Sequence, residues 1–122
     1  MLKFGIISGS FFAGLCIVLG AFGAHALKDQ LSAYSISIYE KAVLYQMFHS
    51  LGILIVTLIG ETKQSLDVSL SIWFFIIGIV LFSGSLYILA VTNVKWLGMI
   101  TPIGGTFFII GWVLLLYKSL NI

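Results

Sequence analysis

The sequence predicts an all-α fold: a four-helix transmembrane bundle with a short amphipathic interfacial helix between the first and second helices. The chain of 122 residues is 61% hydrophobic and only 8% charged, whereas soluble domains carry about 25% charged residues. Its apolar residues gather in four runs, each long enough at about 1.5 Å per residue to cross a hydrocarbon core of about 30 Å. The acidic and basic side chains lie outside these runs or at their edges. We therefore expect one integral membrane domain, residues 1–122, with spans at about 4–24, 41–60, 70–91 and 98–117.

The first span carries small side chains along one face of the predicted helix. These residues fall within an arc of about 100°: Gly5, Gly9, Ala13, Cys16, Gly20, Gly23 and Ala24. Such a face lets another helix approach closely, so Gly20, Gly23 and Ala24 are predicted packing positions and Gly20→Leu is expected to prevent close packing. A signal peptide is the alternative, but the run is longer than the usual apolar core of such a peptide. His25, at the end of the run, is expected at the headgroups.

The connection that follows the first span shows helical periodicity. Its apolar residues recur at helical spacing with polar residues between them: Leu27, Leu31, Tyr34 and Ile38. This pattern predicts a short helix that lies in the membrane interface. Ser37 followed by Glu40 matches a capping box, which would start the second span afresh.

The second span is polar on one side only. At 100° per residue its polar side chains fall within an arc of about 140°: Tyr45, Gln46, His49, Ser50 and Thr57. The opposite arc has only apolar side chains. Because polar groups in a bilayer must face other helices or a wet cavity, we expect Tyr45, Gln46 and His49 to point into the bundle against the small residues of the first span.

The third and fourth spans contribute further candidates for a polar, glycine-rich core. Their polar candidates are Ser83, Ser85, Tyr87 and Thr101, and their packing candidates are Gly84, Gly104 and Gly105. A proline is tolerated near a helix start, as at Pro102. The aromatic residues near the predicted span ends are expected to be interface anchors: Trp73, Trp96, Trp112 and Tyr117.

The lysines do not decide the orientation. Lys3, Lys63 and Lys118 fall on the side of the termini, and Lys28, Lys41 and Lys95 on the other, so the positive-inside comparison is tied. The free α-amine slightly favours cytoplasmic termini.

No catalytic or cofactor site is indicated by the chemistry-bearing residues. A metal or haem iron shared by His25 and His49 would need both imidazoles aimed at one point, and no third ligand is spaced for it. A serine nucleophile needs an orienting acid, and a proton-coupled exchanger of the small multidrug type needs a carboxylate within a span; the spans contain no acid. A net charge of +2 is too small to indicate nucleic acid. We expect no enzyme activity, metal or cofactor, and expect His49 to hydrogen-bond Tyr or Gln partners across helices.

Four strings on different segments carry a family resemblance: GAFGAHALK at 20–28, YQMFH at 45–49, FSGSLY at 82–87 and GMITPIGG at 98–105. In this order and spacing they closely resemble the YgdD/YwdK-type family of small bacterial inner-membrane proteins of unknown function. The staphylococcal relatives in that family include the membrane-stabilising protein MspA. The resemblance covers essentially the whole chain. It implies four helices in the bacterial cell membrane, no established enzymatic activity, and, for the MspA-like relatives, a role in membrane integrity with indirect effects on virulence traits and iron handling.

The favoured interpretation is a membrane-stabilising or partner-binding module whose neutral polar core fixes the helix register. We expect it to contact membrane lipids, to form a homo-oligomer and to bind no nucleic acid; another membrane protein is a further candidate partner. The alternative is a carrier or channel for a lipid or small solute that uses the polar face of the second helix.

Overall fold

A computed structural model describes residues 1–122, and every regular element in it is helical. The helices are α1 (Leu2–His25), α2 (Ala33–Thr62), α3 (Ser69–Gly78), α4 (Gly84–Thr92) and α5 (Thr101–Ser119). A π-helical turn, η1 (Ile79–Ser83), joins α3 to α4, and a 3-10 turn, η2 (Lys95–Met99), precedes α5. Four helical segments are long and apolar enough to cross a membrane. The predicted all-α architecture with four spans is therefore confirmed.

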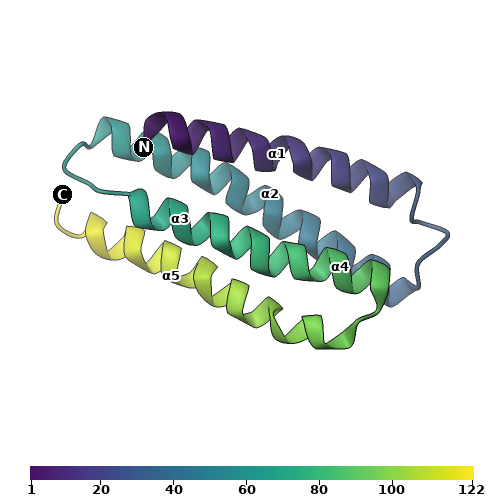
Figure 1. The fold of residues 1–122 in the computed structure, drawn as a ribbon. Coiled ribbons are helices and arrows are strands. Elements are labelled where there is room, and N and C mark those ends of the chain that lie inside the picture. The colour runs from purple at the N-terminus through teal and green to yellow at the C-terminus, as the bar shows by residue number, and fades with distance from the viewer.

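The helices lie side by side in chain order, from α1 through α2 and the α3–η1–α4 rod to α5 (Figure 1). Both termini lie at the same end of the molecule as the α2–α3 connection (Figure 1). In the most apolar stretch of α2, 44% of the residues are buried, and the same share is buried in the α3–η1–α4 rod. In the first and last spans the corresponding share is only 17%. The two middle segments therefore form the core, and α1 and α5 present most of their surface to lipid.

The connection between α1 and α2 differs from the prediction, because it contains no separate interfacial helix. Residues 26–32 form turns, and α2 runs without a break from Ala33 to Thr62. The helix starts at Ser32, whose hydroxyl accepts the backbone N–H of Ser35 at 3.1 Å, so the predicted helix start at Ser37 is wrong. Part of the apolar stripe assigned to the interfacial helix is buried instead: Leu27 and Ile38 belong to one core cluster with residues of α4, and Leu31 packs against it, whereas Tyr34 is 68% exposed.

The π-helical turn η1 was not predicted, and it shapes the contact with α5. Gly78, at its start, faces the Phe108 ring of α5, and an added Cβ there would collide with that ring. At Gly104 the backbone of α5 meets the backbone of Leu81 and Phe82. A π-turn inserts an extra residue into the helical repeat, so it changes which backbone atoms face α5.

The small face of α1 packs against α2 at three of its glycines. An added Cβ at Gly5, Gly9 or Gly23 would collide with side chains of α2, and at Gly23 the obstacle is the Tyr39 ring. Gly20 differs, because its nearest neighbour would be a Val43 methyl at 3.4 Å. The close approach therefore depends on these buried glycines more than on Gly20.

Gly23→Leu is expected to destabilise the protein more than Gly20→Leu. The Tyr39 ring cannot yield without losing the hydrogen bond that its hydroxyl donates to the Leu19 carbonyl, and overpacking a well-packed site costs about 1–3 kcal/mol. Thermal midpoints of the two variants in the same mild detergent check this. Equal midpoints, or a lower midpoint for Gly20→Leu, would contradict the packing described above.

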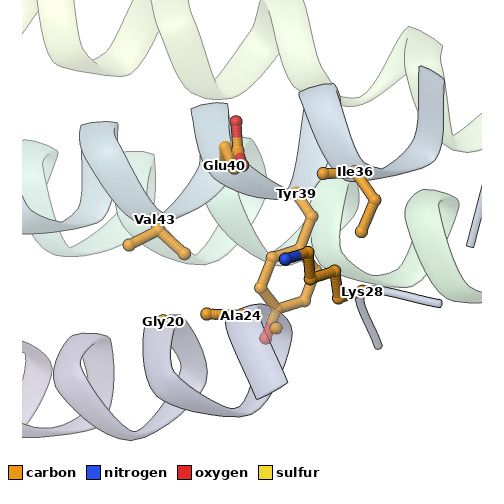
Figure 2. A pocket seen from close by; sticks show the side chains of 8 residues that line it. Gly20, Ala24, Lys28, Ile36, Tyr39, Glu40 and Val43 are labelled. Carbon is orange, nitrogen blue, oxygen red and sulfur yellow. The ribbon is translucent and has the colours of Figure 1, made fainter. Parts of the chain in front are cut away.

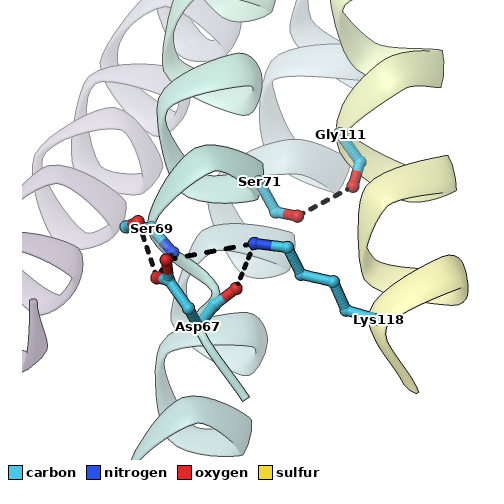
Figure 3. Close-up of polar contacts among 5 residues, drawn as sticks. All are labelled: Asp67, Ser69, Ser71, Gly111 and Lys118. Carbon is cyan, nitrogen blue, oxygen red and sulfur yellow. Dashed lines mark hydrogen bonds and ion pairs between the residues drawn. The ribbon is translucent and has the colours of Figure 1, made fainter. Parts of the chain in front are cut away.

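At the end that holds the termini, the α2–α3 connection is tied to α5 (Figure 3). The Lys118 ammonium donates to the Asp67 carbonyl at 2.8 Å, and its Nζ lies 4.0 Å from the Asp67 carboxylate. The same carboxylate accepts the Ser69 hydroxyl at 2.6 Å and the Ser69 N–H at 3.0 Å. These contacts are exposed, so they fix the start of α3 at a small energetic gain.

Stability should fall slightly in acid through Asp67. Hydrogen bonds from Ser69, its hydroxyl first and its N–H second, hold the pKa of the Asp67 carboxyl below its ordinary value of 3.8, and the charge of Lys118 lowers this pKa further. Because the folded-state pKa is depressed, this stabilisation is present above about pH 4 and is lost as the pH falls through the folded-state value. We expect a loss below about 1 kcal/mol that is absent in Asp67→Asn, measured as thermal midpoint against pH. If the thermal midpoint of the wild type depends on pH in the same way as that of Asp67→Asn, the Asp67 carboxylate does not contribute to stability.

Candidate functional site

Gln46 is the centre of the polar core and joins three segments. Its side chain is 1% exposed. The amide nitrogen donates to the Phe12 carbonyl of α1 at 2.9 Å, and the amide oxygen accepts the Tyr87 hydroxyl of α4 at 2.7 Å. Both ends of the amide are therefore used between helices, and the bond to the Phe12 carbonyl, which can only accept, fixes which end is nitrogen.

The predicted serine and threonine candidates lie on two sides of the α3–η1–α4 rod. The Ser83 hydroxyl donates to the Ala42 carbonyl of α2 at 2.7 Å. On the other side, the Ser85 and Thr101 hydroxyls lie 2.6 Å apart and join α4 to α5. Residues two apart in a helix point in nearly opposite directions, so neighbouring serines can bind the rod to both of its neighbours.

Further cross-links involve residues that the sequence analysis did not name as polar candidates. The Ser71 hydroxyl donates to the Gly111 carbonyl of α5 at 3.0 Å (Figure 3), and the Cys16 thiol donates to the Val43 carbonyl at 3.2 Å. Each is a small polar group in an otherwise apolar span, and this was the only feature of the sequence that could have pointed to a hydrogen bond between helices. The sequence could not show which neighbouring carbonyl each group would reach.

His49 is held by different partners from those predicted. Its side chain is 3% exposed; Nδ1 lies 2.9 Å from the Tyr45 carbonyl one turn earlier, and Nε2 accepts the Trp112 indole N–H at 3.0 Å. The prediction that His49 bonds a Tyr or Gln side chain on another helix is therefore wrong. The prediction that Trp112 is an interface anchor is also wrong, because its indole N–H bonds His49 in the core. Because Nε2 accepts, Nδ1 must carry the proton and donate to the carbonyl, so the imidazole is the neutral Nδ1–H tautomer.

The histidines do not converge on one point. His25 is exposed at the end of α1, whereas His49 lies in the core with both ring nitrogens in hydrogen bonds. No group of three His, Cys, Asp or Glu side chains is placed to hold a metal ion.

Trp112→Phe tests the bond to His49 with little change in shape. The substitution keeps a ring in place but leaves His49 Nε2 without a donor, so we expect a loss of about 1 kcal/mol. In the wild type, nitrogen NMR of the imidazole should show the neutral Nδ1–H form. A spectrum of the Nε2–H tautomer would contradict the arrangement and the predicted loss together.

Tyr45 differs from the predicted inward orientation. It is 40% exposed, its ring packs against Phe82 with 4.6 Å between ring centroids, and its hydroxyl makes no hydrogen bond within the chain. Tyr45 lies at the edge of the polar arc, where a small rotation of α2 decides between core and surface. Gln46, one residue later, takes the inward position.

An open groove of about 600 Å³ lies between α2 and α5, beside Tyr45. We call it the aromatic groove, because its lining side chains include Tyr45, Phe48, His49, Phe82, Phe108 and Trp112. His49 and Phe108 stack with their ring centroids 3.5 Å apart. Gly105 also lines the groove, and the absence of its side chain keeps that wall open.

A smaller crevice of about 380 Å³ lies between the end of α1 and the start of α2 (Figure 2). Gly20, Gly23 and Ala24 line its α1 side. Ala24 is exposed, so the crevice is where the predicted packing of α1 is incomplete. Lys28 and Glu40 also line it, but the Glu40 carboxylate points away from Lys28 in Figure 2.

The predicted glycines of the later spans differ in how tightly they pack. A Cβ at Gly104 would collide with backbone atoms of Leu81 and Phe82. At Gly105 the nearest atom would lie 3.7 Å away, and at Gly84 nothing lies within 4 Å. Gly104 is therefore the close-packing position, while Gly84 and Gly105 leave space.

Comparison with known proteins identifies a family. Residues 19–105 match the model of a family described as "Protein of unknown function (DUF423)". A protein named "UPF0382 membrane protein" from Staphylococcus epidermidis is 51% identical over 120 residues, covering 98% of each chain. A UPF0382 membrane protein of Staphylococcus saprophyticus is 47% identical over 121 residues, covering 99% of this chain and 100% of its own.

The relatives extend beyond staphylococci. The "UPF0382 membrane protein YwdK" of Bacillus subtilis is 41% identical over 121 residues, covering 98% of each chain. No solved structure matches. None of these names states an enzymatic activity or a ligand. With its four membrane-spanning helical segments, this chain is a multi-pass membrane protein, and it belongs to the DUF423 family of unknown function.

Proposed function

We propose that this protein is a non-catalytic membrane module that supports membrane integrity, acting on the surrounding lipid or on a membrane-protein partner. The observation that carries the proposal is the state of its polar core: no buried side-chain nitrogen or oxygen lacks a hydrogen-bond partner. These partners belong to the protein itself, so the buried polar groups are used to hold the bundle together. A rigid, internally satisfied bundle suits a scaffold.

The same observation disfavours a carrier or channel that uses the polar face of α2. Such a protein needs polar groups that can exchange their partners for a passing solute. Gln46, His49 and Ser50 are at most 3% exposed, and each already makes hydrogen bonds within the bundle. The module is therefore the better-supported proposal.

The outer surface supports contact with lipid or with another apolar surface. The outward faces of α1 and α5 carry large apolar side chains that are more than half exposed: Ile7, Phe11, Ile17 and Val18 on α1, and Ile109, Val113 and Leu116 on α5. A second copy of the chain, or a different membrane protein, would pack on these faces.

Cells that lack the protein test this proposal. We expect increased uptake of propidium iodide under mild detergent stress, restored by the wild type and by Gly105→Ala but not by the packing variant Gly104→Ala at equal expression. Native mass spectrometry of the protein in mild detergent then reports the oligomer. Unchanged uptake in the deleted strain, or selective solute flux through liposomes that contain the pure protein, would contradict the module.

A further inference from the structure

We propose that the aromatic groove binds a prenylated quinone, or a similar lipophilic aromatic compound with ring carbonyl oxygens. This inference goes beyond the proposed function, since a scaffold needs no such site. It is carried by three observations: the depth of the groove in the membrane, the unused hydroxyl of Tyr45, and the neutral aromatic lining.

The groove opens near the middle of the bilayer. Two hydrogen bonds fix the register of α2 against α1: Gln46 lies beside Phe12, and Val43 beside Cys16. Tyr45 is therefore level with the centre of α1, which spans Leu2–His25. Since the hydrocarbon core is about 30 Å thick, the ester and phosphate groups of a phospholipid lie about half that thickness away from Tyr45.

The Tyr45 hydroxyl is a donor without an acceptor at this depth. Serine and threonine side chains in a helix can donate to a carbonyl of the preceding turn, as Ser8 and Thr106 do. The phenol of Tyr45 is too far from its own backbone to do so. Its exposed position on the aromatic groove leaves the acceptor to a molecule that enters from the bilayer.

The lining of the groove selects the kind of molecule. No charged side chain lines it, and both nitrogens of His49 are already paired, so a charged solute would find no partner. The partial positive charge of the Tyr45 O–H complements a carbonyl oxygen, and the aromatic walls suit a flat ring. A quinone has both a flat ring and carbonyl oxygens and dissolves at the bilayer centre. A phospholipid acyl chain has neither, and would leave the Tyr45 hydroxyl unpaired.

The probe is decylubiquinone, added to the protein in lipid nanodiscs, with decylbenzene as a control that has a ring and chain but no carbonyl. In a Trp73→Phe/Trp96→Phe background Trp112, on the groove wall, is the only tryptophan, and its fluorescence is excited selectively over that of tyrosine. We expect saturable quenching of Trp112 by decylubiquinone, which an equal concentration of decylbenzene does not relieve. Tyr45→Phe should weaken the quinone affinity about fivefold to tenfold, the effect of one lost hydrogen bond, and Gly105→Leu should abolish binding by filling the groove. Tyr34→Phe, which alters an exposed tyrosine outside the groove, should leave the affinity unchanged.

Quenching that does not saturate, equal competition by decylbenzene, or unchanged affinity in Tyr45→Phe would overturn the proposal. So would a dimer that dissociates in Tyr45→Phe while the wild type fails to bind quinone, because a second copy would then be the occupant. Thermal midpoints check that the variants are folded. If Gly105→Leu unfolds, Tyr45→Phe decides alone, since it removes only the hydroxyl.

Discussion

Gly104→Ala is expected to lower the free energy of unfolding by about 1–3 kcal/mol, whereas Gly105→Ala, at the next position, should leave it unchanged or raise it. The methyl group added at Gly104 would meet the backbone of Leu81 and Phe82. Backbone atoms of a packed helix cannot rotate away as a side chain can, so α5 must move off the π-helical turn. At Gly105 the nearest atom would be 3.7 Å away, an ordinary contact, and alanine is the better helix former by about 1 kcal/mol.

Unfolding in mixed micelles with increasing sodium dodecyl sulfate measures this pair under one set of conditions. The two variants differ from the wild type by the same methyl group, one position apart, so composition and helix propensity are matched. If both variants unfold with the wild-type midpoint, the close approach of α5 to the rod is not as described. If Gly105→Ala is less stable than Gly104→Ala, the register of α5 against the rod must differ from the one described.

Gln46→Met is expected to cost about 1–3 kcal/mol, and adding Tyr87→Phe should recover part of that loss. Methionine keeps the length of the side chain but breaks both bonds of the amide, to the Phe12 carbonyl and from the Tyr87 hydroxyl. The loss exceeds that of the bonds themselves because the half-buried Tyr87 hydroxyl is left without an acceptor. Removing that hydroxyl removes the penalty.

A double-mutant cycle with the same unfolding assay measures the coupling. The double variant should be more stable than the sum of the single losses implies. Strict additivity would show that Gln46 and Tyr87 do not interact in the bilayer. Tyr34→Phe serves as the matched control, since it removes a hydroxyl from a tyrosine that is 68% exposed.

Hydrophobic runs and helical periodicity were enough to predict the four spans, and a polar residue within an apolar run was enough to predict that Gln46, Ser83 and Ser85 would be buried. Periodicity assigns a residue to a face of its helix, but it does not identify the helix that lies opposite. For that reason the bond between His49 and Trp112 was missed, although both residues were considered. Tyr45, at the edge of the polar arc, was placed inward when the helix turns it toward lipid.

Local chemistry also competes with larger-scale packing in ways that a sequence pattern does not reveal. The interfacial helix was expected from an amphipathic stripe, but Leu27 and Ile38 find a core to pack in, and the chain extends α2 instead. The π-helical turn lies where the rod fits closely against Gly104 on another helix. Such a fit is a tertiary property, and no residue pattern in 79–83 predicts it.

Cys16 offers the most direct test of the central claim that the polar core is dry and internally satisfied. It is the single cysteine of the chain and is 0% exposed between α1 and α2. In lipid nanodiscs, a water-soluble methanethiosulfonate reagent should leave Cys16 unmodified until the protein is unfolded, while a Ser65→Cys variant in the exposed α2–α3 connection reacts at once at its new thiol. Modification of native Cys16 at a rate close to that of the Ser65→Cys thiol would show that water reaches the polar face of α2, and would favour a carrier over a scaffold.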